Sequence, residues 1–154
     1  MEEIELPEGM NPEVLKHLMN PQNYGKLDDP DGIGVAHDEK TGEFVIFYIK
    51  KENETIADVT FATNGCQDTV VVGSMFTEMI KGEDVEYAKK AIAKLDQKLG
   101  VATAQQKICA EMVFNAFIAS LINVENLARG EKEEMHVIQS AESCEIEEKD
   151  ADNG

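Results

Sequence analysis

Apolar residues recur along the chain at two different spacings, and the change from one to the other divides it in half. The first half contains runs rich in Val, Ile, Phe and Tyr that are apolar throughout or alternate with polar residues, which predicts β-strands. The second half repeats apolar residues every three or four positions, which predicts amphipathic helices. The strands are expected at residues 33–36, 43–50 and 55–62, and the helices at 66–80, 85–99 and from 103 onward.

Capping residues indicate where the helices begin. Asn11 predicts the start of a short helix over residues 12–19, and Asp84 is expected to cap the second long helix. Thr103 with Gln106 has the spacing of a capping box for the third. The resulting order is a short helix, a loop, a small antiparallel sheet of about three strands, and three helices packed on it. This order predicts a two-layer α+β domain.

One domain accounts for most of the chain, and we expect it to span residues 12–129. Residues 1–11 are expected to form a flexible N-terminus. Residues 130–154 are dominated by Glu, Asp, Lys and Ser and have little to bury, which predicts a solvated, disordered acidic tail.

The charge of the chain excludes several classes of partner. It has 31 acidic and 14 basic residues, for a formal net charge of −17. Such a field repels nucleic-acid phosphates and anionic membranes and favours a basic protein or a metal cation. No unbroken apolar run approaches the roughly 20 residues of a membrane helix. The acidic start of the chain lacks the features of a signal peptide, so a cytoplasmic location is expected.

Two of the three cysteines lie where a turn leads into a helix. Cys66 follows Asn64-Gly65, and Cys109 lies in the first turns of the third long helix. The positive end of a helix favours thiolate, the form that binds soft metals. Each has a structural alternative as a small buried cysteine, and for Cys109 alone that alternative is the favoured one. The case for function is the pair, because two such turns often meet at one end of a two-layer fold. Cys144, in the acidic segment, is interpreted as an incidental thiol with an accessory ligand role as the alternative.

Other candidate chemistry is sparse. His37, in the loop expected before the sheet, is a weak candidate to complete a metal site. The sequence has no Cys-x-x-Cys pair, phosphate-binding loop or nucleophile elbow, so no enzymatic activity is predicted.

Three segments resemble a known family: residues 17–25 (HLMNPQNYG), residues 56–66 (IADVTFATNGC) with the helix that follows, and residues 106–109 (QKIC). The chain resembles the NifU/IscU-type iron–sulfur cluster assembly scaffolds from about residue 12 to residue 128. The resemblance implies a small antiparallel sheet flanked by helices. It also implies a scaffold or carrier of iron or an iron–sulfur cluster, with a cysteine desulfurase and apo iron–sulfur proteins as partners.

Carried over residue by residue, the family's site is only partly present. That family builds its cluster on three cysteines, with an aspartate two residues after the first and a histidine just before the third. Cys66 and Cys109 match the second and third cysteines. Thr41 stands at the first, Glu43 at the aspartate and Ile108 at the histidine. The resemblance therefore implies Cys66 and Cys109 as ligands, with Glu43 as a further carboxylate.

Several alternatives remain open at the level of sequence. Two chains sharing one cluster as a homodimer would supply four thiolates. A cluster-free protein that binds a desulfurase or accepts sulfur on Cys109 is the main functional alternative. A Cys66–Cys109 redox pair and zinc as a substitute metal are the others. Residues 102–106 lack the proline of the segment that the family's chaperone grips, which argues against chaperone-assisted cluster release.

Overall fold

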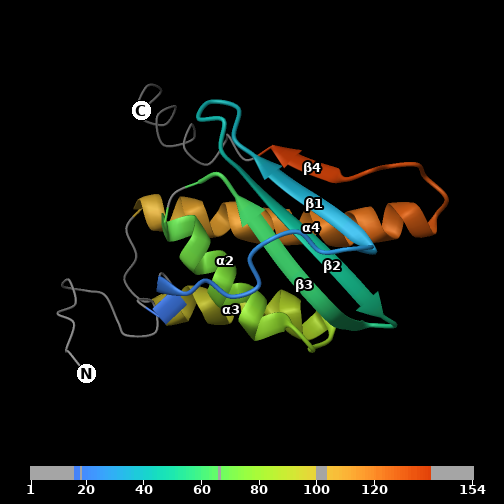
Figure 1. Cartoon of the computed structure of the whole chain (residues 1–154), viewed down its shortest axis with the longest axis horizontal. Coiled ribbons are helices and arrows are strands. Elements are labelled where there is room, and N and C mark those ends of the chain that lie inside the picture. The colour runs from blue at the N-terminus through green and yellow to red at the C-terminus, as the bar shows by residue number, and fades with distance from the viewer. Residues whose placement is uncertain (1–15, 18, 66, 100–103, 140–154) are drawn as a thin grey trace.

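The computed structural model describes residues 16–17, 19–65, 67–99 and 104–139. These form a sheet on one side and helices on the other, as Figure 1 shows, so the predicted α+β class is confirmed. The elements are β1 (Gly32–His37), β2 (Phe44–Glu52), β3 (Thr55–Thr63), α2 (Gln67–Ile80), α3 (Val85–Leu99), α4 (Ala104–Ala128) and β4 (His136–Gln139).

The sheet differs from the prediction by one strand. Its order is β3-β2-β1-β4; the first three strands are antiparallel, whereas β4 pairs in parallel with β1. The sheet is therefore mixed and four-stranded. β4 lies within the segment expected to be a disordered tail, so that prediction is wrong for residues 136–139. The chain turns back after α4 and pairs along the edge of β1 that β2 leaves open; residues 1–11 and 140–154 lie outside the described range.

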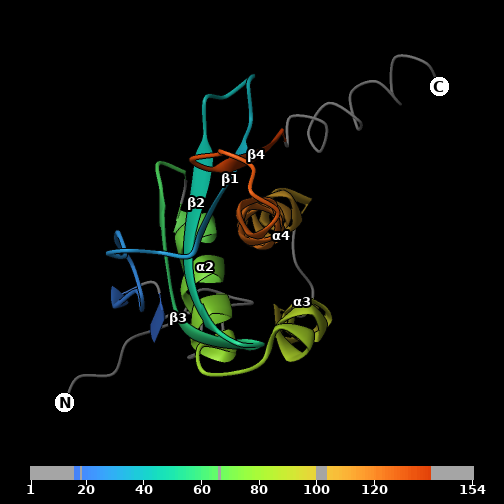
Figure 2. The same cartoon turned by 90° about the vertical axis from the view of Figure 1, so that its right-hand side faces the viewer.

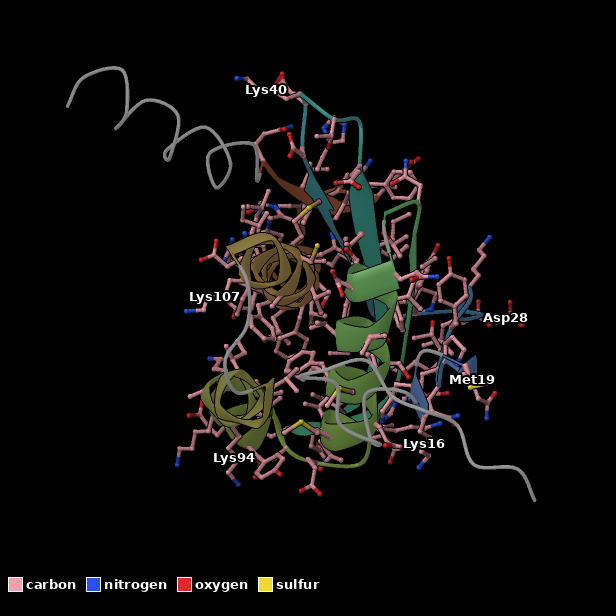
Figure 3. All side chains as sticks on the ribbon, turned by 90° about the vertical axis from the view of Figure 1, so that its left-hand side faces the viewer. Lys16, Met19, Asp28, Lys40, Lys94 and Lys107 are labelled. Atoms are coloured by element: carbon pink, nitrogen blue, oxygen red, sulfur yellow. The ribbon has the colours of Figure 1, made fainter. Side chains whose placement is uncertain are left out.

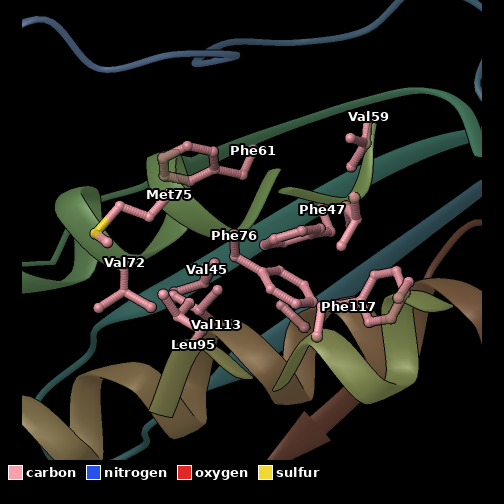
Figure 4. Close-up of a cluster of buried hydrophobic side chains, with 14 of the residues drawn as sticks. Val45, Phe47, Val59, Phe61, Val72, Met75, Phe76, Leu95, Val113 and Phe117 are labelled. Atoms are coloured by element: carbon pink, nitrogen blue, oxygen red, sulfur yellow. The ribbon is translucent and has the colours of Figure 1, made fainter. Parts of the chain in front are cut away.

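The helices cover one face of the sheet, as the side view in Figure 2 shows. Four phenylalanines from β2, β3, α2 and α4 meet between the layers (Figure 4). Phe47 lies at their centre, with its ring centroid 6.1 Å from each of Phe61, Phe76 and Phe117. All four side chains are fully buried, so this contact joins the sheet to α2 and to α4, the helix that carries Cys109.

Helix α4 lies directly on β1 because β1 presents glycine to it. A Cβ placed on Gly34 would fall 2.1 Å from Ser120 N and 2.3 Å from Ala116 O, and one on Gly32 would fall 2.6 Å from Ser120 O. By length and composition the segment Lys107–Ala128 is apolar enough to cross a membrane, although 56% of its most apolar window is buried within the fold. Packing on β1 accounts for that apolar character.

The helix starts largely follow the capping residues. Asp84 Oδ1 accepts a hydrogen bond from Tyr87 N at 2.7 Å, which confirms Asp84 as the cap of α3. Of the short helix expected at 12–19, the described residues 16, 17 and 19 are helical. His17 holds this segment against α2, with its Nδ1 2.6 Å from Ser74 Oγ. Asn11 and the Thr103–Gln106 capping box lie outside the described side chains.

Candidate functional site

The turns and helix starts that the sequence identified as candidate site positions lie at one end of the molecule. Strands β1 and β3 end there, β2 begins there, and α2 and α4 have their N-terminal ends on the same side (Figure 1). We call this region the site end and define it by the turn at residues 38–43, the turn at residues 63–65 and the first turns of α4. The turn that precedes position 66 and the start of the helix that carries Cys109 therefore share one end of the fold.

The turn at residues 38–43 is held rigidly by its own backbone. Asp38 is 2% exposed, and its Oδ1 accepts a hydrogen bond from Lys40 N at 2.9 Å. Gly42 N donates to Asp38 O, and Asp38 N donates to Glu43 O. Gly42 has a φ of +78°, a left-handed conformation that glycine adopts without strain. The turn therefore presents the residues after Gly42 in a fixed direction.

Thr41 and Glu43 face each other within this turn. Thr41 Oγ1 accepts a hydrogen bond from Glu43 N at 3.2 Å and lies 3.4 Å from Glu43 Oε1. The Glu43 side chain is half-buried at the junction of the turn and β2. The hydroxyl and the carboxylate thus occupy neighbouring positions at the edge of the site end.

Asn64 joins this turn to the one that precedes Cys66. Its Oδ1 accepts a hydrogen bond from Phe44 N at 2.8 Å, and its Nδ2 donates to Gly42 O at 3.1 Å. Thr63 Oγ1 donates to Phe44 O at 2.5 Å and accepts from Gly65 N at 2.8 Å. The two turns therefore lie side by side, and the chain leaves the second one directly into position 66. Cys66 itself lies outside the described residues.

Sequence reasoning treated Asn64 only as a turn residue and missed this bridge. The Asn-Gly pair is a general turn signal, and nothing in it reveals that the side chain reaches across to another turn. The signal available was the strand pairing, since β2 and β3 place Val45 opposite Thr63. With that register, residue 64 has to lie beside the start of β2.

Tyr24 contacts the turn at residues 63–65 from the outer edge of β3. Its hydroxyl donates to Thr63 O at 2.9 Å, and its ring meets Phe61 edge-on at 5.2 Å. Seen from the side where α4 begins (Figure 3), the segment carrying Met19 and Asp28 lies along the β3 side, and Lys107 of α4 lies across from it. The N-terminal segment therefore supports the turn at 63–65 from outside the helical layer.

Cys109 lies in α4 with its side chain 3% exposed. Helix α4 runs opposite to β1, because Gly32 meets Ser120 and Val124 whereas Gly34 meets Ala116 and Ala119. From Ala116 back to Cys109 the helix rises about 10 Å, and from Gly34 to His37 the strand advances about 10 Å. Cys109 is therefore level with the end of β1, at the site end.

His37 is not brought together with Cys109. It is the last residue of β1 rather than part of a loop, and it pairs with Phe44 of β2. Because Gly34 faces α4 and strand residues alternate between faces, His37 faces the opposite side of the sheet. The alternation of the strand thus separates it from the helical layer.

Within the described part of the chain, no group of three His, Cys, Asp or Glu side chains is placed to hold a metal. Cys66 lies outside this part of the chain. The ligand set of Cys66 and Cys109 with Glu43 therefore stays a prediction, as does the Cys66–Cys109 redox pair.

Comparison with known proteins gives consistent results. Residues 10–128 match the family model described as NifU-like N terminal domain. The iron–sulfur cluster assembly scaffold protein IscU of Aquifex aeolicus is 38% identical over 105 residues, which cover 66% of this chain and 67% of that protein. The scaffold protein IscU 1 of Archaeoglobus fulgidus is 32% identical over 111 residues, covering 71% and 72%.

Solved structures show the same fold. A NifU-like N-terminal protein from Brucella abortus superposes with a TM-score of 0.59 at 17% identity, covering 75% of this chain and 94% of that one. An iron–sulfur scaffold protein from Fervidobacterium islandicum gives a TM-score of 0.51 at 15% identity, covering 76% and 94%.

Proposed function

This chain belongs to the family of NifU-like N-terminal domains, and from that premise we propose that it is an iron–sulfur cluster assembly scaffold whose site lies at the site end. The observation that carries the proposal is the Asn64 bridge. It holds the turn of Glu43 against the turn that leads into Cys66. Cys109, on α4, lies at the same end of the fold.

The donor set suits a soft, thiophilic cargo. Cys66 and Cys109 would supply thiolates, which are the usual ligands of iron–sulfur clusters and common ligands of tetrahedral zinc. Glu43 supplies a carboxylate beside them, and its half-buried position strengthens its attraction for a cation. The net charge of −17 adds a general field that favours cations over anions. Zinc would bind the same donors as a substitute.

The partners follow from the proposed role. A scaffold receives sulfur and iron, holds them and passes a cluster on, so the chain would bind a cysteine desulfurase and apo iron–sulfur proteins. It would not itself turn over a substrate. The absence of proline at residues 102–106 argues against a chaperone that grips this segment.

Anaerobic reconstitution with iron and sulfide tests the proposal. The wild type is expected to gain the visible absorbance of a cluster and the matching mass in a native spectrum. The Cys66→Ser, Cys109→Ser double variant is expected to lose both. His37→Gln is the matched control, because its side chain faces away from α4, and it should bind as the wild type does. Equal uptake by the double variant and the wild type would refute the scaffold role.

A second candidate is a cluster-free interaction protein that binds a cysteine desulfurase or accepts sulfur. It is favoured by the residues at two positions of the family's site, because Thr41 and Ile108 stand where the resembling family has a cysteine and a histidine. Stoichiometric binding to a desulfurase, with no cluster formed on reconstitution, is the result that would select it. A cluster that forms on the wild type and is lost in the double variant would exclude it.

A further inference from the structure

The sheet has two outer edges, and within the described residues the chain covers only one of them. At the β3 edge, Gly25 N donates to Phe61 O at 2.8 Å, and Phe61 N donates to Asn23 O at 3.0 Å. At the opposite edge (Figure 1), β4 pairs with β1 and with no further strand of the described part of the chain. Backbone N–H and C=O groups of β4 therefore point outward without a strand to pair with.

Strand β4 lacks the residues that usually protect an open edge. The stretch from Met135 to Gln139 reads MHVIQ, without lysine, proline or an acidic residue, although the four residues before it are Glu-Lys-Glu-Glu. Lysine and proline are common means of preventing further pairing at a sheet edge. Met135 is 40% exposed and Val137 is 45% exposed. The β4 edge is therefore apolar and open, in a chain with a net charge of −17.

Val137 also extends an apolar row across the sheet. It lies opposite Val35 of β1, which in turn lies opposite Ile46 of β2. Because Gly34 faces α4 and strand residues alternate between faces, this row lies on the face away from α4. Figure 2 shows the helices on the other face of the sheet. A strand added beside β4 would continue the row from Val137.

Side chains hold β4 in a fixed position. Asn123 Oδ1 accepts a hydrogen bond from Ile33 N at 2.9 Å, and Asn123 Nδ2 donates to Glu133 Oε1 at 2.9 Å. Asn126 Nδ2 donates to the same oxygen at 3.0 Å, and His136 Nδ1 lies 3.0 Å from Glu133 Oε2. Hydrogen bonds from Asn123, then Asn126 and His136, lower the pKa of Glu133 to about 2. The edge is therefore already ordered, which reduces the entropy lost when a partner binds.

We propose that the β4 edge is an interaction surface for a second copy of this chain, which pairs its own β4 antiparallel to this one. An open edge is satisfied by an extended strand, so the occupant is a strand. Val137 is the middle residue of the uncharged stretch, and pairing about a two-fold axis through it sets Val137 opposite Val137 and His136 opposite Ile138. No like charges oppose each other in this register, whereas a strongly basic or acidic segment finds no opposite charge there.

This arrangement separates the two candidate sites. β4 runs parallel to β1, and β1 ends at the site end, so each β4 points towards the site end of its own copy. Antiparallel pairing then places the two site ends at opposite ends of the combined sheet. Such a dimer does not share one cluster between its chains, and it does not depend on the scaffold function. A strand of four residues buries little area, so we expect a reversible dimer with a dissociation constant in the micromolar range or weaker.

Sedimentation equilibrium of the full chain over a range of concentrations, in the presence of EDTA, tests the proposal. The wild type is expected to pass from monomer to dimer as its concentration rises. Hydrogen exchange of the β4 amides should slow over the same range, because outward N–H groups become hydrogen-bonded. Val137→Lys is expected to weaken association by about tenfold or more, since it sets two like charges opposite each other.

A second variant and a matched control make the test specific to β4. Met135→Lys, at a position that is already exposed, should also weaken association. Met19→Lys makes the same substitution at a position that is 67% exposed and precedes the β3 edge, and it should associate as the wild type does. Circular dichroism checks that each variant is folded.

Three results would overturn the proposal. A wild type that stays monomeric at every concentration would leave the edge to a strand of a different protein. Equal association of the Val137→Lys, Met135→Lys and Met19→Lys proteins would place the dimer interface elsewhere. A dimer that forms only without EDTA, and is lost in the Cys66→Ser, Cys109→Ser double variant, would be held by a shared metal instead.

Discussion

Adding one methyl group to Gly34 is expected to destabilise the fold, because α4 leaves no room for it. The new Cβ would lie 2.1 Å from Ser120 N, 2.3 Å from Ala116 O and 2.6 Å from the Ala119 carbonyl carbon. All three atoms are backbone, so no side-chain rotation relieves the overlap. Non-bonded heavy atoms in contact prefer about 3.5–4.0 Å, so α4 would have to move away from β1 by roughly 1.5 Å.

The direction of the change in the free energy of unfolding distinguishes steric overlap with α4 from the general preference of strands for alanine over glycine. Without the close approach, Gly34→Ala would stabilise the strand by roughly 0.5–1 kcal/mol, because alanine loses less backbone freedom on folding. Overpacking costs typically about 1–3 kcal/mol, and a clash with backbone falls at the upper end. We therefore expect the free energy of unfolding to fall by about 3 kcal/mol. For a chain of this size that corresponds to a drop of about 6–12 °C in Tm.

Urea unfolding followed by circular dichroism at 222 nm measures the change. Gly73→Ala is a matched comparison, since its Cβ would meet the Phe61 ring at 2.4 Å, a side chain rather than backbone. Phe61→Leu should recover part of the loss caused by Gly73→Ala, whereas Ala119→Gly should recover none of the loss caused by Gly34→Ala. A Gly34→Ala protein as stable as the wild type, or more stable, would show that α4 does not lie directly on β1.

The remaining predictions concern single hydrogen-bonded groups. Asp84→Ala should lower the free energy of unfolding by about 1 kcal/mol by removing the cap of α3, measured by urea unfolding with Asp84→Asn as the retaining control. Asn64→Ala should lower the free energy of unfolding by about 1–2 kcal/mol and reduce the cluster absorbance gained on reconstitution with iron and sulfide. Unchanged absorbance would count against the bridge as the feature that positions the site. Glu133 has a folded pKa of about 2 against an ordinary 4.5, so its stabilisation is complete above about pH 4.5 and is lost as the pH falls towards 2. Glu133→Gln should remove that pH dependence of Tm, and an unchanged acid transition in the variant would contradict the assignment.

The local elements of the fold could be predicted from the chain because their signals are local. The unbroken apolar run in β2 is typical of a strand covered on both faces. The alternation in β3 and the three-to-four spacing in α2 and α3 follow from which residues lie on one face of a strand or a helix. Asp84 marked the start of α3 because a carboxylate accepts the unpaired N–H groups of the first turn. The same local segments carried the resemblance that the family match then confirmed.

The candidate site was predictable only in part. Cys109 could be assigned to the start of α4 from helical spacing, since that spacing is a property of neighbouring residues. The side of the sheet that His37 faces depends on the register of β1 against α4, and the short run in β1 does not show where the strand ends. The Asn64 bridge likewise depends on β2 and β3 being paired.

The sequence by itself therefore determined the strands of the hairpin, the helices and the cap of α3, because hydrophobic spacing and capping act over a few residues. Only the tertiary structure decided that residues 136–139 form a strand. Those four residues are at best half-buried and carry little hydrophobic signal of their own. They pair because α4 returns the chain to the open edge of β1, and because Asn123 and Asn126 on α4 hold Glu133 in place. The free edge of β1 and these hydrogen bonds to Glu133 exist only once the rest of the domain has folded.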